Sequence, residues 1–171
     1  MGLSDESIQY FINIIQDLQA NNQLNQMHQF IQHGTTSTYI HCLAVAYTSY
    51  KLTYQLPFQF DRNSVVRGAM LHDFYLYDWH IPHKSHRLHG FYHPGFALNN
   101  AKKHYKISPI EEDIICKHMW PLTITRCPKY RESILVCIVD KLSSLSEIFR
   151  LPTKTKEFHR IRDILSNSIS K

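Results

Sequence analysis

Residues 61–75 read DRNSVVRGAMLHDFY, and this stretch decides how the rest of the chain is interpreted. Asp61 belongs to the residue types that cap the start of a helix. Apolar residues then recur at helical spacing, at Val65, Val66, Ala69 and Met70. The stretch therefore predicts a buried helix that reaches about residue 74 and carries His72 and Asp73 in its apolar last turn.

The same helical period runs through most of the chain, whereas alternating strand patterns are almost absent. Ser108-Pro109-Ile110-Glu111 is a capping box with proline at the first helical position, the clearest helix start in the sequence. Ser4 is a candidate N-cap for the first helix. Besides the helix that Asp61 caps, the pattern predicts helices at 4–20, 24–32, 35–52, 94–105, 108–119, 130–150 and 154–168.

The fold predicted from these elements is an all-α bundle of seven or eight helices in one domain, 1–171. Its core covers about 28–150, with helices 4–20 and 154–168 packed on it. In the long helix 130–150, the residues expected to point inward are Ile134, Cys137, Ile138, Leu142 and Leu145.

The composition supports a globular chain: 43% of the 171 residues are hydrophobic and 19% are charged. No basic signal-like or membrane-spanning stretch is found, and none of the four cysteines forms a C-x-x-C pair. These features predict reduced, buried thiols in a cytoplasmic protein with no membrane partner. The net charge of +5 is spread along the chain, which favours a small anionic ligand over a stable nucleic-acid partner.

Twelve histidines are present, and several chemically costly side chains interrupt apolar helical runs. These are His41, His72, Asp73, His118 and Asp140. A buried cation would pair with the two carboxylates and take the imidazoles as ligands, since helix bundles build metal sites from facing helices. Taken singly, each histidine has an alternative as a satisfied core residue, and Asp140 has an alternative partner in Lys141 or Arg131.

The order His41, His72-Asp73 and Asp140 resembles the H…HD…D motif of the HD-domain superfamily of metal-dependent phosphohydrolases, over about residues 28–150. Members with two further histidines before the last aspartate hold two metals, and His93 and His118 stand where those are expected. The resemblance implies that His41, His72, Asp73 and Asp140 bind one metal. It implies that Asp73, His93 and His118 bind the second, with Asp73 bridging.

Histidine and carboxylate ligands without thiolate suit transition metals better than Ca²⁺ or Mg²⁺, and we expect two divalent ions: Fe or Mn first, with Ni, Co or Zn as alternatives. The implied function is hydrolysis of a phosphomonoester or phosphodiester, most naturally of a nucleotide, by a metal-bridging hydroxide. The same ligand set also occurs in mixed-valent di-iron oxygenases of this superfamily. A non-catalytic ligand-binding HD module is the third reading.

The loop 76–92 is rich in histidine and aromatic residues and also carries Lys84 and Arg87. We expect it to bind the substrate phosphate, with His89 as both a phosphate contact and the general acid; a solvated surface loop is the alternative. Lys141 resembles a family residue that lies near the phosphate, although pairing with a carboxylate would equally explain it. The expected partner is a small phosphorylated substrate, and the sequence is compatible with a homodimer.

Overall fold

The computed structural model describes residues 2–81, 88–149, 151 and 154–169, and in them the chain is almost entirely helical. The described α-helices are α1 (Asp5–Gln19), α2 (Thr38–Leu52), α3 (Arg62–Leu71), α4 (His89–His104), α5 (Pro109–Lys117), α6 (Arg131–Ile148) and α7 (Lys156–Ile169). A 3-10 helix, η1 (Leu24–Gln29), and a small antiparallel hairpin of β1 (Ile31–His33) and β2 (Thr36–Ser37) lie between α1 and α2. The predicted all-α class is confirmed.

The helix starts follow the predicted caps. Ser4, Asp61 and Ser108 each accept a hydrogen bond from the backbone N–H three residues on, at the starts of α1, α3 and α5. The capping box of α5 is complete, because the Glu111 side chain also accepts from the Ser108 backbone. Local sequence therefore sets where these helices begin.

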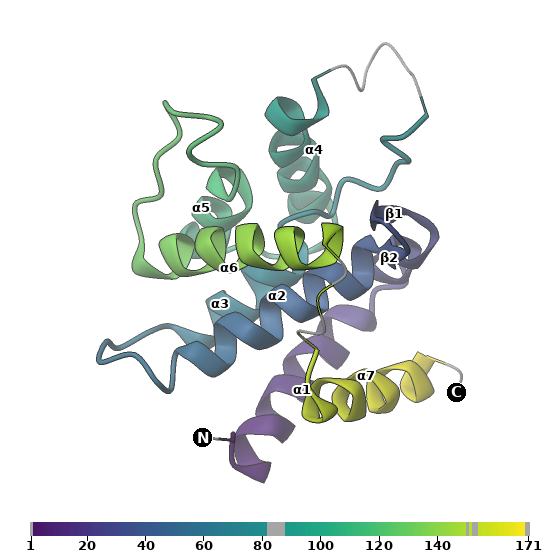
Figure 1. Ribbon diagram of the computed structural model, residues 1–171, viewed down its shortest axis with the longest axis vertical. Helices are drawn as coiled ribbons and strands as arrows, with labels where there is room; N and C mark the ends of the chain where they lie inside the picture. The colour runs from purple at the N-terminus through teal and green to yellow at the C-terminus, as the bar shows by residue number, and fades with distance from the viewer. Residues whose placement is uncertain (1, 82–87, 150, 152–153, 170–171) are drawn as a thin grey trace.

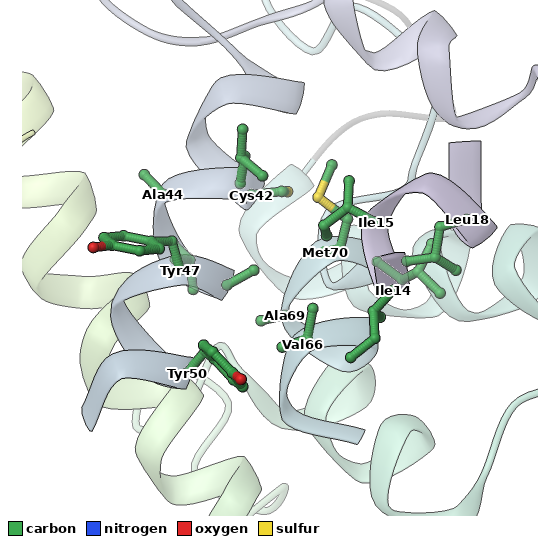
Figure 2. Packing of buried hydrophobic residues seen from close by; sticks show 14 of the residues in the cluster. Ile14, Ile15, Leu18, Cys42, Ala44, Tyr47, Tyr50, Val66, Ala69 and Met70 are labelled. Carbon is green, nitrogen blue, oxygen red and sulfur yellow. The ribbon is translucent and has the colours of Figure 1, made fainter. Parts of the chain in front are cut away.

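The helices are arranged around α2 and α3, which lie side by side through the middle of the molecule (Figure 1). In that view α6 crosses in front of them, α4 and α5 lie above, and α1 and α7 lie below. Figure 2 shows the buried side chains that α1, α2 and α3 bring together, among them Ile15, Leu18, Cys42, Tyr50, Val66 and Met70. The C-terminal helix packs on α1 and buries Phe158, Ile161 and Leu165.

None of the helices in the described part of the chain combines the length and the apolar composition that crossing a membrane requires. The four cysteines are free, as expected, but Cys127 is exposed and Cys116 half-buried, so the prediction of four buried thiols holds only for Cys42 and Cys137.

Two predicted boundaries are wrong. The segment expected to be helical to Gln32 forms the hairpin instead, because Gly34 takes a left-handed conformation (φ +58°) that turns the chain. Helix α4 begins at His89, well before the predicted start at Pro94, so His93 lies within its second turn. Pro94 removes one helical hydrogen bond there, and its burial together with His93 offsets that loss.

The predicted inward face of α6 is also wrong except at Cys137. Ile134, Ile138, Leu142 and Leu145 are 47–61% exposed. Successive residues of a helix are 100° apart, so Ile138 and Leu142 each lie about 200° from Asp140. Asp140 is 5% exposed and points inward, and the helix must therefore turn those two residues outward.

The contact between α3 and α5 depends on Gly68, which gives a stability prediction. A Cβ at Gly68 would lie 2.6 Å from Cδ1 and 3.0 Å from Cβ of Ile114. Gly68→Ala should therefore lower the free energy of unfolding by about 1 kcal/mol, because overpacking outweighs the gain in helix propensity. Urea unfolding followed by circular dichroism measures the change.

Gly95, in α4, is the matched control, because a Cβ there would meet nothing within 4 Å. Gly95→Ala should leave stability unchanged or raise it by up to about 1 kcal/mol. Equal effects of the two substitutions would show that α3 and α5 do not approach as closely as described.

Candidate metal centre

Six of the predicted site residues meet at one buried point, delivered by five different helices. His41 lies in α2, His93 in α4 and Asp140 in α6, while His72 and His118 are the residues that end α3 and α5. Asp73 follows His72 directly. Each of the six is no more than 5% exposed, which is unusual for ionisable side chains.

The side chains form two groups of candidate metal ligands that share Asp73. One consists of His41, His72 and Asp73, and the other of Asp73, His93 and His118; within each group, one ligand atom per residue lies within 4.8 Å of the others. Both groups could hold a metal ion.

The two oxygens of Asp73 face different groups. Oδ1 lies 3.1 Å from Nε2 of His93 and 3.4 Å from Nε2 of His118. Oδ2 lies 3.3 Å from Nε2 of His72. A carboxylate placed in this way has one oxygen for each of two neighbouring cations.

Asp140 completes the first group from the opposite side. Its Oδ1 lies 3.1 Å from Nε2 of His41 and 3.6 Å from Nε2 of His72. Lys141 donates to Oδ2 of the same carboxylate (2.9 Å), so the alternative partner considered from the sequence is also present. Arg131, the other alternative, donates a hydrogen bond to the Gln59 carbonyl.

The imidazoles are oriented through their outer nitrogens. Nδ1–H of His72 donates to the Ala69 carbonyl (2.7 Å), and Nδ1–H of His93 donates to the His89 carbonyl (2.8 Å). Nδ1–H of His118 donates to the Ile115 carbonyl (2.9 Å). A carbonyl oxygen can only accept, so Nδ1 carries the proton and Nε2 of the neutral ring presents a lone pair to the centre. Metal-binding histidines are held in this way.

The inner atoms lack the partners that burial demands. Among the described residues, His72 Nε2 and Asp73 Oδ1 are buried and have no hydrogen bond. Nε2 of His93 and Nε2 of His118 lie 2.8 Å apart, which requires a proton or a metal ion between them. Two nitrogens at right angles on one metal, each about 2.1 Å from it, lie about 3.0 Å apart. The residues present therefore fit a metal.

In the metal-free protein the same groups carry opposite charges. Burial opposes ionisation throughout, yet the Asp140 and Glu147 carboxylates raise the pKa of His41 to about 10. Asp73 similarly holds the pKa of His72 well above its ordinary value, and the histidines hold the pKa of Asp73 and Asp140 well below theirs. His118 differs, because burial lowers its pKa to about 4. A metal would take the place of protons on His41 and His72.

Two outer contacts were missed from the sequence. Gln32, in the unpredicted hairpin, donates from Nε2 to Oδ2 of Asp73 (2.6 Å). The Tyr75 hydroxyl in turn donates to Oε1 of Gln32. Glu147 accepts from Nδ1 of His41 (3.0 Å). Glu147 lies seven residues after Asp140, two turns along the same helix face, and that spacing could have found it. No local pattern singles out Gln32.

The expected phosphate contacts are only partly described. Lys84 and Arg87 lie outside the described residues. His89 is half-buried beside the centre: its ring stacks on that of His93 at a centroid distance of 4.5 Å, and its Nδ1 lies 2.9 Å from the Tyr77 hydroxyl. Lys141 reaches the centre from α6 and donates to the His118 carbonyl as well as to Asp140.

Comparison with known proteins adds no family assignment: neither a protein-family model, nor a curated protein, nor a solved structure matches the chain. The donor set and its geometry are therefore the basis for assigning a function.

The charge state of the centre leads to a prediction about metal binding. At pH 7 the raised pKa values keep His41 and His72 protonated without metal, and a metal can bind Nε2 only after that proton leaves. Titrating metal-free protein with Mn²⁺ or Zn²⁺ should release one proton from each histidine, and affinity should rise with pH toward about 10. Calorimetry in two buffers of different ionisation enthalpy measures the proton count.

His159→Ala is the matched control, because His159 is exposed on α7 and should not change the count. Metal binding without proton release, or with affinity independent of pH, would contradict the described charge state.

Proposed function

We propose that the chain is an HD-domain metal-dependent phosphohydrolase that cleaves a phosphomonoester or phosphodiester, most naturally of a nucleotide. The observation that carries the proposal is Asp73, whose two oxygens face two separate sets of imidazoles. That arrangement, together with the order His41, His72-Asp73, His93, His118 and Asp140, is what the H…HD…H…H…D motif requires of a two-metal centre.

The donor chemistry supports transition metals. The two candidate groups offer imidazole nitrogens and carboxylate oxygens only. Cys42 is the nearby thiol, but its Sγ lies 3.6 Å from Nδ1 of His72, on the outer side of that ring. Nitrogen and oxygen donors without thiolate favour Fe or Mn, with Ni, Co and Zn as alternatives. We therefore propose two divalent transition metals per chain.

Two such ions would supply Lewis acidity, lowering the pKa of water and neutralising charge on a phosphoryl group. The residues of the chain then have distinct roles. Asp73 stays ionised and spans both ligand groups, so it orients the centre. Gln32 and Glu147 fix Asp73 and His41 from outside. His89 is assigned to protonate the leaving group from Nε2, because Tyr77 engages its Nδ1.

An aromatic side chain and the net charge support the substrate class. The ring of Trp79 lies 5.2 Å from that of His89 and 3.9 Å from that of His80, so an aromatic side chain lies close to the proposed acid. Such a side chain can stack a nucleobase. The net charge of +5 favours an anionic substrate. Lys141, with a side chain 36% exposed, is the described cation assigned to the phosphate.

The metal assignment is tested by substituting shared and unshared ligands. Asp73→Ala should lose both metals and all phosphatase activity, because both groups depend on this carboxylate. His118→Ala should retain about one metal per chain, since the first group stays complete. Elemental analysis of protein purified without chelator, with p-nitrophenyl phosphate, bis-p-nitrophenyl phosphate and nucleotides as substrates, gives both readouts.

His159→Ala again serves as control and should keep two metals and full activity. Full metal content in Asp73→Ala would refute the centre. Two iron atoms, a mixed-valent EPR signal and O₂ consumption without phosphate release would instead identify the oxygenase chemistry of the same scaffold. Two bound metals with neither phosphatase nor oxygenase activity would favour the hypothesis of a non-catalytic ligand-binding module.

The role of His89 is tested separately. His89→Ala should lower kcat about 100-fold or more at unchanged metal content, because general acids typically contribute 10²–10⁴-fold. The loss should be smaller for substrates with an activated leaving group such as p-nitrophenolate, which needs little protonation. An equal loss of kcat for substrates with activated and with unactivated leaving groups would show that His89 positions His93 and transfers no proton.

A further inference from the structure

The outward face of α6 is apolar over most of its length. Between Ile134 and Phe149 every exposed residue of this segment is an Ile, Leu or Phe. We call these residues the α6 stripe: Ile134, Ile138, Leu142, Leu145, Ile148 and Phe149, which are 47–68% exposed. The buried side of the same helix is mixed, with Glu132, Ser133, Asp140 and Ser146 beside the apolar Leu135, Val136, Cys137 and Val139.

The outward face of α6 therefore differs from that of an ordinary surface helix, whose polar side faces water. Single exposed apolar residues need no explanation, but a continuous row of six large ones marks an interaction surface. In Figure 1 α6 crosses in front of α2 and α3, and no described helix lies in front of it. Lys141, the lysine among the stripe residues, turns back to bond Asp140 and the His118 carbonyl.

The middle of the stripe is symmetric about Asp140. Ile138 and Leu142 lie two residues on either side of it, and Ile134 and Leu145 lie six before and five after. Arg131 and Phe149 lie nine on either side. A two-fold axis at this level would place Ile138 of one helix opposite Leu142 of an antiparallel copy, and Arg131 opposite Phe149.

The charges are compatible with that pairing. Arg131 is exposed at the first turn of α6, whereas the last turn exposes Ile148 and Phe149 and carries the partial negative charge of a helix C-terminus. Antiparallel pairing brings Arg131 of each copy to the C-terminal end of the other. Lys141 is the charged side chain within the stripe, and because Asp140 and the His118 carbonyl already accept from its ammonium group, a second copy would bury no unpaired charge there.

The extent of the stripe also fits a dimer. From Ile134 to Phe149 it runs about 22 Å along the helix. A standard interface removes about 800 Å² per partner, roughly a tenth of a small protein's surface, and the surface of this chain is 9540 Å². Six half-exposed side chains provide the apolar centre that such an interface requires, with Ser143 and Ser144 beside it.

We infer that the α6 stripe is the interface of a two-fold symmetric homodimer, in which α6 packs antiparallel against α6 of a second copy. Two-fold dimers are the commonest soluble assemblies, and their interfaces must be self-complementary, as this stripe is. In the dimer, α6 is covered on both sides: by the metal centre through Asp140 and by the partner through Ile138 and Leu142.

The test is the oligomeric state of the full chain. Sedimentation velocity from about 1 to about 100 μM should show a dimer for the wild type. Ile138→Glu should weaken association about 100-fold or more, because two like charges would meet near the two-fold axis. Leu145→Glu should do the same, and it provides a second variant if the first does not fold.

Tyr10→Glu is the control, because Tyr10 is an exposed aromatic residue on α1, and this variant should remain dimeric. Unchanged helicity and metal content in all variants would show that the fold is intact. A wild type that stays monomeric at 100 μM overturns the inference, and so does a dimer that survives both α6 substitutions. A chain that stays monomeric and binds a different protein through the α6 stripe would also overturn the inference.

Discussion

The buried carboxylate of Asp73 is the constraint on which the centre of this structure depends. An ionised carboxylate in an apolar interior is strongly destabilising unless cations surround it. Here the imidazoles of His72, His93 and His118 lie around its two oxygens. Because these histidines come from α3, α4 and α5, satisfying one aspartate requires three helix ends or turns to meet. The charge of Asp73 is therefore compensated only when α3, α4 and α5 pack against one another.

Two of the ligands also end the helices that carry them. His72 and His118 are the C-terminal caps of α3 and α5, and each donates Nδ1–H to the carbonyl three residues earlier, at Ala69 and Ile115. The last carbonyls of a helix lack intrahelical donors. The same hydrogen bond that satisfies such a carbonyl fixes the ring so that Nε2 faces the centre. Helix termination and ligand orientation are thus achieved by one contact in each case.

The orientation of α6 links the centre to the surface of the molecule. Asp140 and Glu147 both approach His41 from this helix, two turns apart on one face. A helix turned to deliver them must present Ile138 and Leu142 to the outside. An apolar outer face follows from the geometry of the inner one, and covering that face with a second copy would hold α6 in the orientation that the ligands need.

The sequence by itself determined the starts of α1, α3 and α5, the all-α class and five of the six residues that meet in the core, because caps and apolar periodicity are local and buried ionisable residues are conspicuous. The sixth, His93, was implied by the resemblance to the HD-domain motif. Only the tertiary structure decided three other features. Gln32 joins the centre through a hairpin that the helical pattern concealed. Oδ1 of Asp73 faces His93 and His118 and Oδ2 faces His72, whereas the resemblance implied only that Asp73 bridges. The face of α6 that turns inward is the one that carries Asp140, since apolar periodicity shows that a helix has a hydrophobic side but not which neighbour its charged residues must reach.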